Sequence, residues 1–545
     1  MIKEYLFREN ILSNIYNNFI YYFSFDDMYK YFLIVLGILL LNWLLIVFLA
    51  KPEYSDFIPS NKYTFNKNQK QDWFGLGFLF ISFIIYTICM YSVEVSLFNN
   101  FDSMTIDYVD ALKEGAKSGF TGLRFTPLAG IDTNIIYGVS NNSYIITAYV
   151  LLKELLCLWM LYKFFNFIPV FKRLIGLAII CIIPAVFWIN NIVYPEQNIL
   201  IFTILSLCFL IKYYRTKSKL SLLWFVIFMN SALYTKETVI LFYAGLGIYM
   251  LFLSVAKGKI TVNSFFSPFK TISLHPVEYM MFCSMFIYAN CWMLATPFEQ
   301  GNRYIATHQY NIIQMLETYA VELYLILISL IILVYKTIKQ KFSTMTLLGE
   351  GSVISSTLIA MIVVFYMRIA SVSDYPLSYY LHLPAVFCIM YIINNITNRW
   401  LLIVALLPTV FISIVINYIT FDQQQGKSRR DIAEYIISNA KYKDMSIYLY
   451  STEIADYKWW KIRNWSATLK YVNPNLKLKL KTDLSRDFIG YDNMFYYKFY
   501  EKQIGYPVVG DHILVNKKNE KNYQPDTNQK LEYENKFYKL YFIEK

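Results

Sequence analysis

Long apolar stretches alternate with short polar loops over the first 420 residues of the chain. Most of these stretches approach the ~20 residues that a helix needs to cross the hydrocarbon core of a bilayer. The pattern therefore predicts an all-α membrane bundle of about 12 or 13 transmembrane helices. The twelve stretches lie at 31–50, 73–98, 143–162, 174–193, 198–212, 219–235, 238–255, 277–296, 317–335, 345–367, 378–395 and 400–419.

The pattern changes after about residue 420. Ile432, Ala433, Ile436, Ile437 and Ala440 recur at helical spacing. Strand-like runs follow at Met445–Tyr450, Leu476–Lys481, His512–Val515 and Phe537–Ile543. We therefore expect an interfacial or additional N-terminal helix at 1–30, a transmembrane domain at 31–420 and a small α/β domain at 421–545.

Composition supports a membrane protein and narrows its class. Apolar residues make up 57% and charged residues only 16%, against about 25% charged in soluble proteins, which excludes an ordinary soluble enzyme. The seven cysteines lie in apolar stretches and form no C-x-x-C, so neither a disulfide framework nor a zinc site is predicted. The net charge of +12 is typical of cytoplasmic loops in a membrane protein, and we expect no nucleic-acid partner.

Charge also predicts the orientation of the bundle. The loops on one side hold eighteen Lys and Arg residues and those on the other side hold six. The rule that positive loops stay inside places the richer set in the cytoplasm. The outward-facing segments are then 99–142 (a first outer loop with interfacial helices), the turns 194–197 and 235–237, the loops 297–316 and 368–377, and the domain 421–545.

The first outer loop begins with a run of acids. Asp102 follows the second apolar stretch directly and is either a helix N-cap or a carboxylate directed into a cavity within the membrane. Asp107 and Asp110 share the polar side of an amphipathic helix with Glu114. We interpret that side as a solvated face and keep Asp107 and Asp110 as alternative acids.

Two short outer turns carry charges at the edge of apolar stretches. Glu196 opens one of these stretches, and an ionisable group at such depth is costly unless it pairs or lines a wet cavity. It is either functional or an acid favoured by the helix dipole. Lys236 lies in the next outer turn, where it binds a phosphate, pairs with Glu237 or extends to the interface.

Further candidates follow in the later outer loops. Arg303 is suited to clamping an anionic group, and Arg368 and His382 either contact a ligand or pair structurally within the bundle. His308, Tyr380 and His382 lie nearby in the sequence. No phosphate-binding G-x-x-x-x-G-K-[ST] motif occurs, and no outer loop contains D-x-D. No cofactor and no metal site are therefore predicted, with a divalent metal left as an alternative that the sequence does not support.

The order of these motifs resembles the GT-C class of integral-membrane glycosyltransferases, which includes protein O-mannosyltransferases and the aminoarabinose transferase of lipid A. The resemblance covers most of residues 73–545. It is carried by Asp102, Phe125-Thr126-Pro127-Leu128, Tyr194-Pro195-Glu196, Leu233-Tyr234-Thr235-Lys236-Glu237 and Tyr379-Tyr380-Leu381-His382-Leu383-Pro384.

The resemblance implies transfer of a sugar from a polyprenyl-phosphate donor to a lipid, glycan or protein acceptor on the outer face. In that reaction Asp102 would be the general base, and Glu196 would orient the acceptor or stabilise charge on the sugar. The residues that would hold the donor phosphate are Lys236, Arg303 and Arg368. Those that would contact substrate are Tyr380, His382 and His308.

Two other classes of membrane protein stay open, a lipid-linked glycan flippase or transporter and a glycan polymerase. Only 19 of the 545 residues are Gly, whereas transporters need close helix contacts and broken helices. A polymerase would lack the folded C-terminal domain. The abundance of Tyr, Lys, Asn and Ile is typical of an AT-rich genome, and we expect an integral protein of a bacterial cytoplasmic membrane with its C-terminal domain extracytoplasmic.

Overall fold

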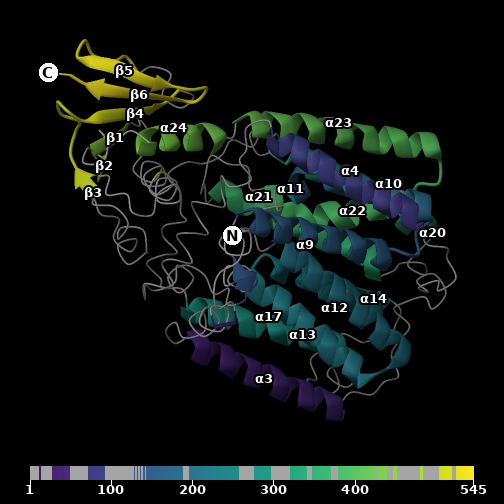
Figure 1. Cartoon of the computed structure of the whole chain (residues 1–545). Coiled ribbons are helices and arrows are strands. Elements are labelled where there is room, and N and C mark those ends of the chain that lie inside the picture. The colour runs from purple at the N-terminus through teal and green to yellow at the C-terminus, as the bar shows by residue number, and fades with distance from the viewer. Residues whose placement is uncertain are drawn as a thin grey trace.

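The computed structural model of the chain is mostly helical and carries a small sheet near its C-terminus (Figure 1). The structure describes residues 12–13, 28–49, 72–92, 128, 132, 135–136, 139–140, 143–187, 196–256, 275–295, 319–340, 347–369, 378–423, 426–438, 446–450, 465, 479–482, 502–517 and 523–544.

Within those ranges, a helix lies in each of the twelve apolar stretches singled out from the sequence. These helices are α3 (Met28–Leu49), α4 (Trp73–Ser92), α9 (Ser143–Phe164), α10 (Val170–Ile182), α12 (Glu196–Thr216), α13 (Lys219–Thr235), α14 (Val239–Ala256), α17 (Pro276–Ala295), α20 (Ala320–Gln340), α21 (Ser352–Ile369), α22 (His382–Asn395) and α23 (Arg399–Gln423). By length and composition, α12, α20 and α23 are apolar enough to cross a membrane.

Three of the stretches are not single α-helices. The fourth breaks at Ile183, and the short α11 (Pro184–Phe187) follows, because a proline cannot donate the backbone hydrogen bond that would continue α10. The tenth opens with a π-helical turn, η4 (Leu347–Gly351), and the eleventh with a 3₁₀ turn, η5 (Ser378–Leu381).

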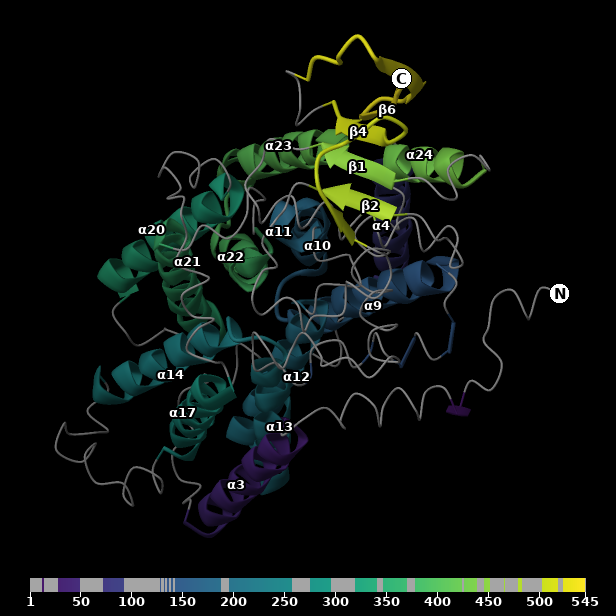
Figure 2. The same cartoon turned by 90° about the vertical axis from the view of Figure 1, so that its left-hand side faces the viewer.

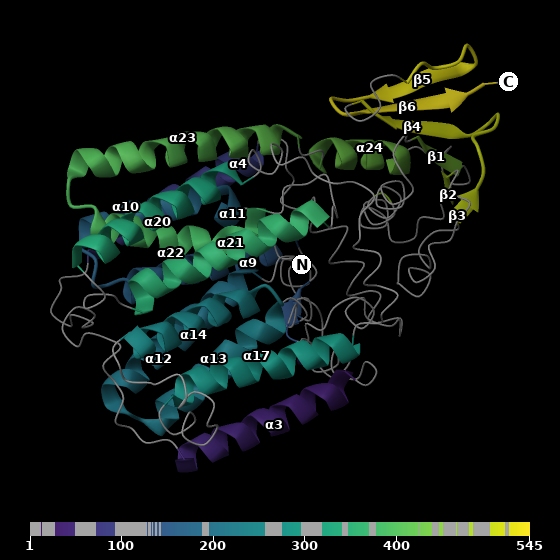
Figure 3. The same ribbon diagram turned by 180° about the vertical axis from the view of Figure 1, so that it is seen from behind.

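The helices lie side by side, with α3 at one edge and α23 at the opposite edge (Figures 1 and 3). Their shared interior is rich in large rings. Phe387 of α22 stacks on Phe242 of α14 at 5.2 Å and meets Phe165, just after α9, edge-on at 6.0 Å between centroids. The outward surface is apolar as well, since Phe48 of α3 is 82% exposed and Phe411 of α23 is 67% exposed.

One tight turn joins α12 to α13 and makes the two helices antiparallel neighbours. Lys217 in that turn has a φ of 55°, which is the left-handed conformation that glycine adopts at lowest cost. Its N–H donates to the carbonyl of Tyr213 at 2.7 Å. Because the turn is so short, the first residue of α12 and the last residue of α13 lie at the same end of the bundle.

Basic side chains link neighbouring segments at the end of the bundle where α22 finishes. Lys172 donates to the carbonyls of Ile393 and Ile396 at 3.3 and 2.8 Å, which satisfies acceptors that the end of α22 leaves open. Lys336 also pairs with the buried Glu350 at 2.5 Å.

The C-terminal sheet has the strand order β3-β2-β1-β4-β6-β5. Pairs among β1, β2, β3 and β4 are parallel, and β4–β6 and β5–β6 are antiparallel. The strands are β1 (Ser446–Tyr450), β2 (Lys479–Thr482), β3 (Lys502–Ile504), β4 (His512–Asn516), β5 (Gln529–Glu534) and β6 (Tyr538–Ile543). The four strand-like runs predicted from the sequence correspond to β1, β2, β4 and β6, whereas β3 and β5 were not predicted.

Helix α24 (Gly426–Ser438) covers one face of this sheet. Ile432, Ala433 and Ile436 of α24 share a buried core with Leu514 of β4 and Leu540 of β6. Three of the apolar positions that predicted a helix here therefore form its buried face. The sheet and its helix are the mixed α/β unit expected after the apolar stretches.

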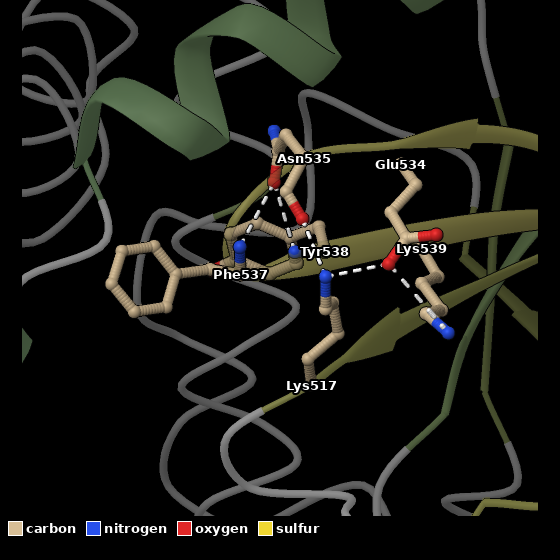
Figure 4. A network of polar contacts seen from close by, with 6 residues as sticks. All are labelled: Lys517, Glu534, Asn535, Phe537, Tyr538 and Lys539. Carbon is tan, nitrogen blue, oxygen red and sulfur yellow. Dashed lines mark hydrogen bonds and ion pairs between the residues drawn. The ribbon is translucent and has the colours of Figure 1, made fainter.

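The turn between β5 and β6 is held by a polar network (Figure 4). The side-chain oxygen of Asn535 accepts from the backbone N–H groups of Phe537 and Tyr538 at 3.1 and 2.9 Å. Lys517 donates to Glu534 at 2.6 Å and to the carbonyl of Asn535 at 2.9 Å. The Lys517 hydrogen bond lowers the pKa of the Glu534 carboxyl below its usual value.

The sheet lies at the end of the bundle where α23 finishes and α24 begins (Figures 1 and 2). Only residues 396–398 separate α22 from α23, so these two helices are antiparallel. The start of α22 therefore faces the same end of the bundle as the sheet. We call this the sheet end.

Candidate functional site

A buried ion pair lies at the sheet end, between α12 and the turn that follows α13. Glu196 is the first residue of α12, and its carboxylate accepts a hydrogen bond from the Lys236 ammonium. Both side chains are buried. The second carboxylate oxygen of Glu196, Oε2, is buried and makes no hydrogen bond with any residue that the structure describes. The pair thus presents an acceptor atom that still lacks a donor.

A third segment of the chain closes over this ion pair. The ammonium of Lys236 lies 4.6 Å from the centroid of the Tyr380 ring in η5, within the range of a cation–π contact. His382 follows two residues later as the first residue of α22 and is also buried. Residues far apart in the sequence therefore meet at one ammonium group.

The two residues after Glu196 reach other polar partners. The side-chain amide of Gln197 donates to the carboxylate of Glu154 in α9 at 3.2 Å. Asn198 forms a side-chain hydrogen bond with Asp132. Three consecutive residues in the first turn of α12 thus contact three acidic or basic partners from different segments.

Asp132 forms the centre of a second polar cluster. Its Oδ2 accepts from the Tyr149 hydroxyl at 2.6 Å and from the Lys153 ammonium at 2.8 Å. Burial alone would raise the pKa of Asp132, but the Lys153 charge and the hydrogen bonds from Lys153, Tyr149 and Asn198 outweigh it. The pKa of Asp132 therefore lies below its usual value, and this carboxylate stays ionised at neutral pH.

A backbone hydrogen bond ties the segment before α9 to the ion-pair site. The N–H of Leu128 donates to the carbonyl of Tyr234 at 3.1 Å, and Tyr234 lies two residues before Lys236. Leu128 belongs to the Pro-Leu segment that contributed to the family resemblance. Leu128 therefore lies beside the end of α13, and Asp132, four residues later in the chain, lies beside α9.

One more buried acid lies near the start of α20. Glu322 is fully enclosed, and its Oε1 accepts from the backbone N–H of Ala185 in α11 at 3.1 Å. Helix α11 packs against η5, which carries Tyr380. The carboxylate of Glu322 therefore fixes the short helix that supports the aromatic side of the site.

The structure brings together some of the residues predicted from the sequence. Lys236 pairs with Glu196 and also contacts Tyr380. His382 lies two residues after Tyr380 in the chain. Arg368 lies in α21, one residue before its end. The remaining candidates lie outside the described residues, and they are Asp102, Asp107, Asp110, Arg303 and His308.

Sequence reasoning missed the charged residues that lie inside the apolar stretches. Lys153 and Glu154 interrupt the stretch 143–162, and Glu322 interrupts 317–335. An ionisable residue in such a stretch indicates a functional site by default, and that signal was present in the sequence. Asp132 carried no comparable signal, because it lies in a loop with several other acids.

The chemistry available at the sheet end combines carboxylates with ammonium groups. Lys236 and Lys153 can bind an anionic group, and Glu196, Glu154 and Asp132 can accept protons or hydroxyl hydrogen bonds. In the part of the chain that the structure describes, no three His, Cys, Asp or Glu side chains gather as metal ligands would.

No family model matches the chain, and no curated protein matches its sequence. What the chain does must therefore follow from its own residues.

Proposed function

We propose that the chain is an integral-membrane glycosyltransferase of the GT-C type. It transfers a sugar from a polyprenyl phosphate to a lipid, glycan or protein acceptor on the outer face of a bacterial cytoplasmic membrane. The apolar outward surface of the helices supports a lipid environment, since exposed Phe48 and Phe411 are unfavourable in water. Three of the helices are already long and apolar enough to span a bilayer.

The observation that carries the proposal is the buried Glu196–Lys236 pair beneath Tyr380. A buried ion pair adds little net stability, because removing both charges from water offsets their attraction. Its presence at the end of an apolar bundle is better explained by chemistry. A lipid-linked phosphate brings its negative charge to this depth, and an ammonium group there stabilises the charge.

The reaction is a displacement at the anomeric carbon of the sugar. The acceptor oxygen forms a bond to that carbon as the bond to the phosphate oxygen breaks, through an oxocarbenium-like transition state. The phosphate leaves with the bonding electron pair, and a carboxylate takes the proton of the acceptor hydroxyl. In our proposal Asp102 is that base, and Glu196 orients the acceptor or stabilises positive charge on the sugar.

Cations gather around the leaving group in this scheme. Lys236 is the central one, and Arg303 and Arg368 reach the phosphate from the neighbouring outer loop and helix. Tyr380, His382 and His308 contact the substrate. The prenyl chain lies against the apolar side chains that the bundle exposes to the membrane.

Orientation is tested with reporter fusions in cells. Fusions after Asn142 and after Lys545 should report an extracytoplasmic position, and a fusion at Lys217 should report a cytoplasmic one. A cytoplasmic signal from Lys545 would place the sheet end on the side where the donor headgroup is not expected, and the proposal would fail.

Activity is tested by mass spectrometry of envelope glycans in cells with and without the protein. A glycan present only with the wild type identifies the product. Asp102→Asn should abolish that product without changing the amount of inserted protein. Near-normal product would remove Asp102 from the role of base and transfer it to Asp107 or Asp110. Asp72→Asn is a matched control, because Asp72 is exposed and caps α4, a function that Asn performs equally well.

A further inference from the structure

The Asp132 cluster is a second set of polar side chains at the sheet end. Asp132 comes from the first outer loop, Tyr149 and Lys153 from α9, and Asn198 from α12. Three donors converge on one carboxylate and fix its direction. Such an arrangement orients a carboxylate to accept further hydrogen bonds, because an ionised carboxylate has about four acceptor positions.

The carboxylate of Asp132 is more accessible than its ion-pair partner Lys153. Its side chain is 24% exposed, whereas that of Lys153 is 6% exposed. Tyr149 and Lys153 both donate to Oδ2. The carboxylate is therefore more exposed than the ammonium group that holds it.

The cluster adjoins the ion pair along the first turn of α12. Asn198 lies two residues after Glu196, so the two side chains leave α12 on opposite sides of its first turn. Gln197 lies between them and bonds Glu154, the neighbour of Lys153. A headgroup whose phosphate binds Lys236 can therefore extend its next polar groups past the start of α12 toward Asp132.

We propose that Asp132 binds a hydroxyl group of the sugar carried by the prenyl phosphate, so that the Asp132 cluster is the sugar subsite of the enzyme. This inference rests on the proposed function. A sugar hydroxyl can donate to the acceptor position that Tyr149, Lys153 and Asn198 leave open, and hydrogen bonds to a charged acceptor are the stronger kind. Lys153 and Tyr149 act as positioning residues that hold the carboxylate.

The ionisation of Asp132 favours binding over proton transfer. A general base works best when its pKa lies near the working pH, whereas the pKa of Asp132 lies below its usual value because of Lys153 and its hydrogen bonds. A carboxylate that stays ionised is a constant acceptor of hydroxyl hydrogen bonds. The roles of base and of sugar binder are thereby divided between different acids.

The test measures binding of lipids with and without a sugar to the full-length protein in nanodiscs. The probes are decaprenyl phosphate and decaprenyl phosphate linked to a panel of hexoses and pentoses, titrated by thermal stabilisation. We compare wild type, Asp132→Asn, Tyr149→Phe and the control Asp72→Asn. The melting temperature of each variant without lipid, compared with that of wild type, serves as its folding control.

The wild type should bind at least one sugar-bearing lipid more tightly than the bare lipid. Asp132→Asn should weaken that binding about 10- to 100-fold and leave the bare lipid unchanged, with a smaller loss for Tyr149→Phe. Retention of the sugar preference by Asp132→Asn would overturn the inference, as would an equal loss for both kinds of lipid or no sugar preference in the wild type. Absence of binding of either lipid to the wild type would instead refute the proposed function.

Discussion

The buried Glu196–Lys236 pair allows a quantitative test that does not depend on substrate. In Lys236→Met the carboxylate of Glu196 stays fully enclosed without its counter-ion. Breaking a buried pair in this way costs ~3–5 kcal/mol. We therefore expect Lys236→Met to lower the free energy of unfolding by that amount.

The reverse variant, Glu196→Met, should cost less. It leaves the Lys236 ammonium buried, but the ammonium keeps its contact with the ring of Tyr380 at 4.6 Å. A desolvated cation–π contact contributes ~1–2 kcal/mol, so the expected cost falls to about 2–3 kcal/mol. The structure thus predicts an asymmetry between the two single variants.

The double variant completes the thermodynamic cycle. Replacing both charges by Met removes the desolvation penalty and fills the volume with apolar atoms, so its stability should return to within ~1 kcal/mol of wild type. The coupling between the two positions is then at least about 4 kcal/mol. If Lys236 holds the donor phosphate as we propose, the double variant should nevertheless make no glycan product.

Unfolding can be followed through two buried thiols. Cys157 in α9 and Cys388 in α22 are fully enclosed and react with a fluorogenic maleimide only when the bundle opens. Stability is measured with each variant in the same detergent. Additive effects of the two single variants, or a Lys236→Met variant as stable as wild type, would refute the buried pair. A stable double variant that retains activity would refute the role of Lys236.

Three further predictions concern other parts of the fold. Glu322→Leu removes the acceptor for the Ala185 N–H and should cost ~1–3 kcal/mol in the same thiol assay, whereas Glu322→Gln should cost less because the amide oxygen still accepts. Lys217→Gly relieves the left-handed turn after α12 and should stabilise the protein by about 1 kcal/mol. The lowered pKa of Glu534 means that its pairing with Lys517 stabilises the hairpin above the ordinary carboxyl pKa of about 4.3 and that this contribution is lost as the pH falls through the folded-state pKa. Hydrogen exchange of the β5–β6 amides should show this loss, and Lys517→Met should reduce it, leaving the smaller contribution of Lys539.

Each of these outcomes has a contrary result. Equal stability of the Leu and Gln variants at position 322 would show that the hydrogen bond to α11 contributes nothing. A destabilised Lys217→Gly would show that the lysine side chain contributes more than its backbone conformation costs. Hairpin exchange with the same acid dependence in Lys517→Met would assign that dependence to another group.

The helices could be predicted from the sequence because the apolar stretches are long and the loops between them are polar. Glu196 and Lys236 were identifiable as well, since each lies in an outer turn of a few residues. Their contact with each other was not, because 40 residues separate them. The pairing depends on α12 and α13 being antiparallel neighbours, which places the first residue of one beside the last turn of the other.

Other features depend on tertiary packing that no local pattern records. Tyr380 reaches Lys236 because α22 begins with a 3₁₀ turn at the sheet end, and Asp132 reaches Lys153 because the outer loop returns to α9. Strand β5 (Gln529–Glu534) escaped prediction because it is an edge strand with mostly polar residues, and β3 because it has only three residues.

The position of Glu196 and Lys236 at the two open ends of one helical hairpin has a consequence for biogenesis. Both charges belong to a single unit, residues 196–236, that is synthesised without interruption and closed by the turn at Lys217. Each charge therefore meets its counter-charge as soon as the second helix leaves the ribosome, long before Tyr380 is made. If the chain inserts into a membrane as we propose, the hairpin can enter the lipid phase with both charges paired, and later helices assemble around a charge pair that has already formed.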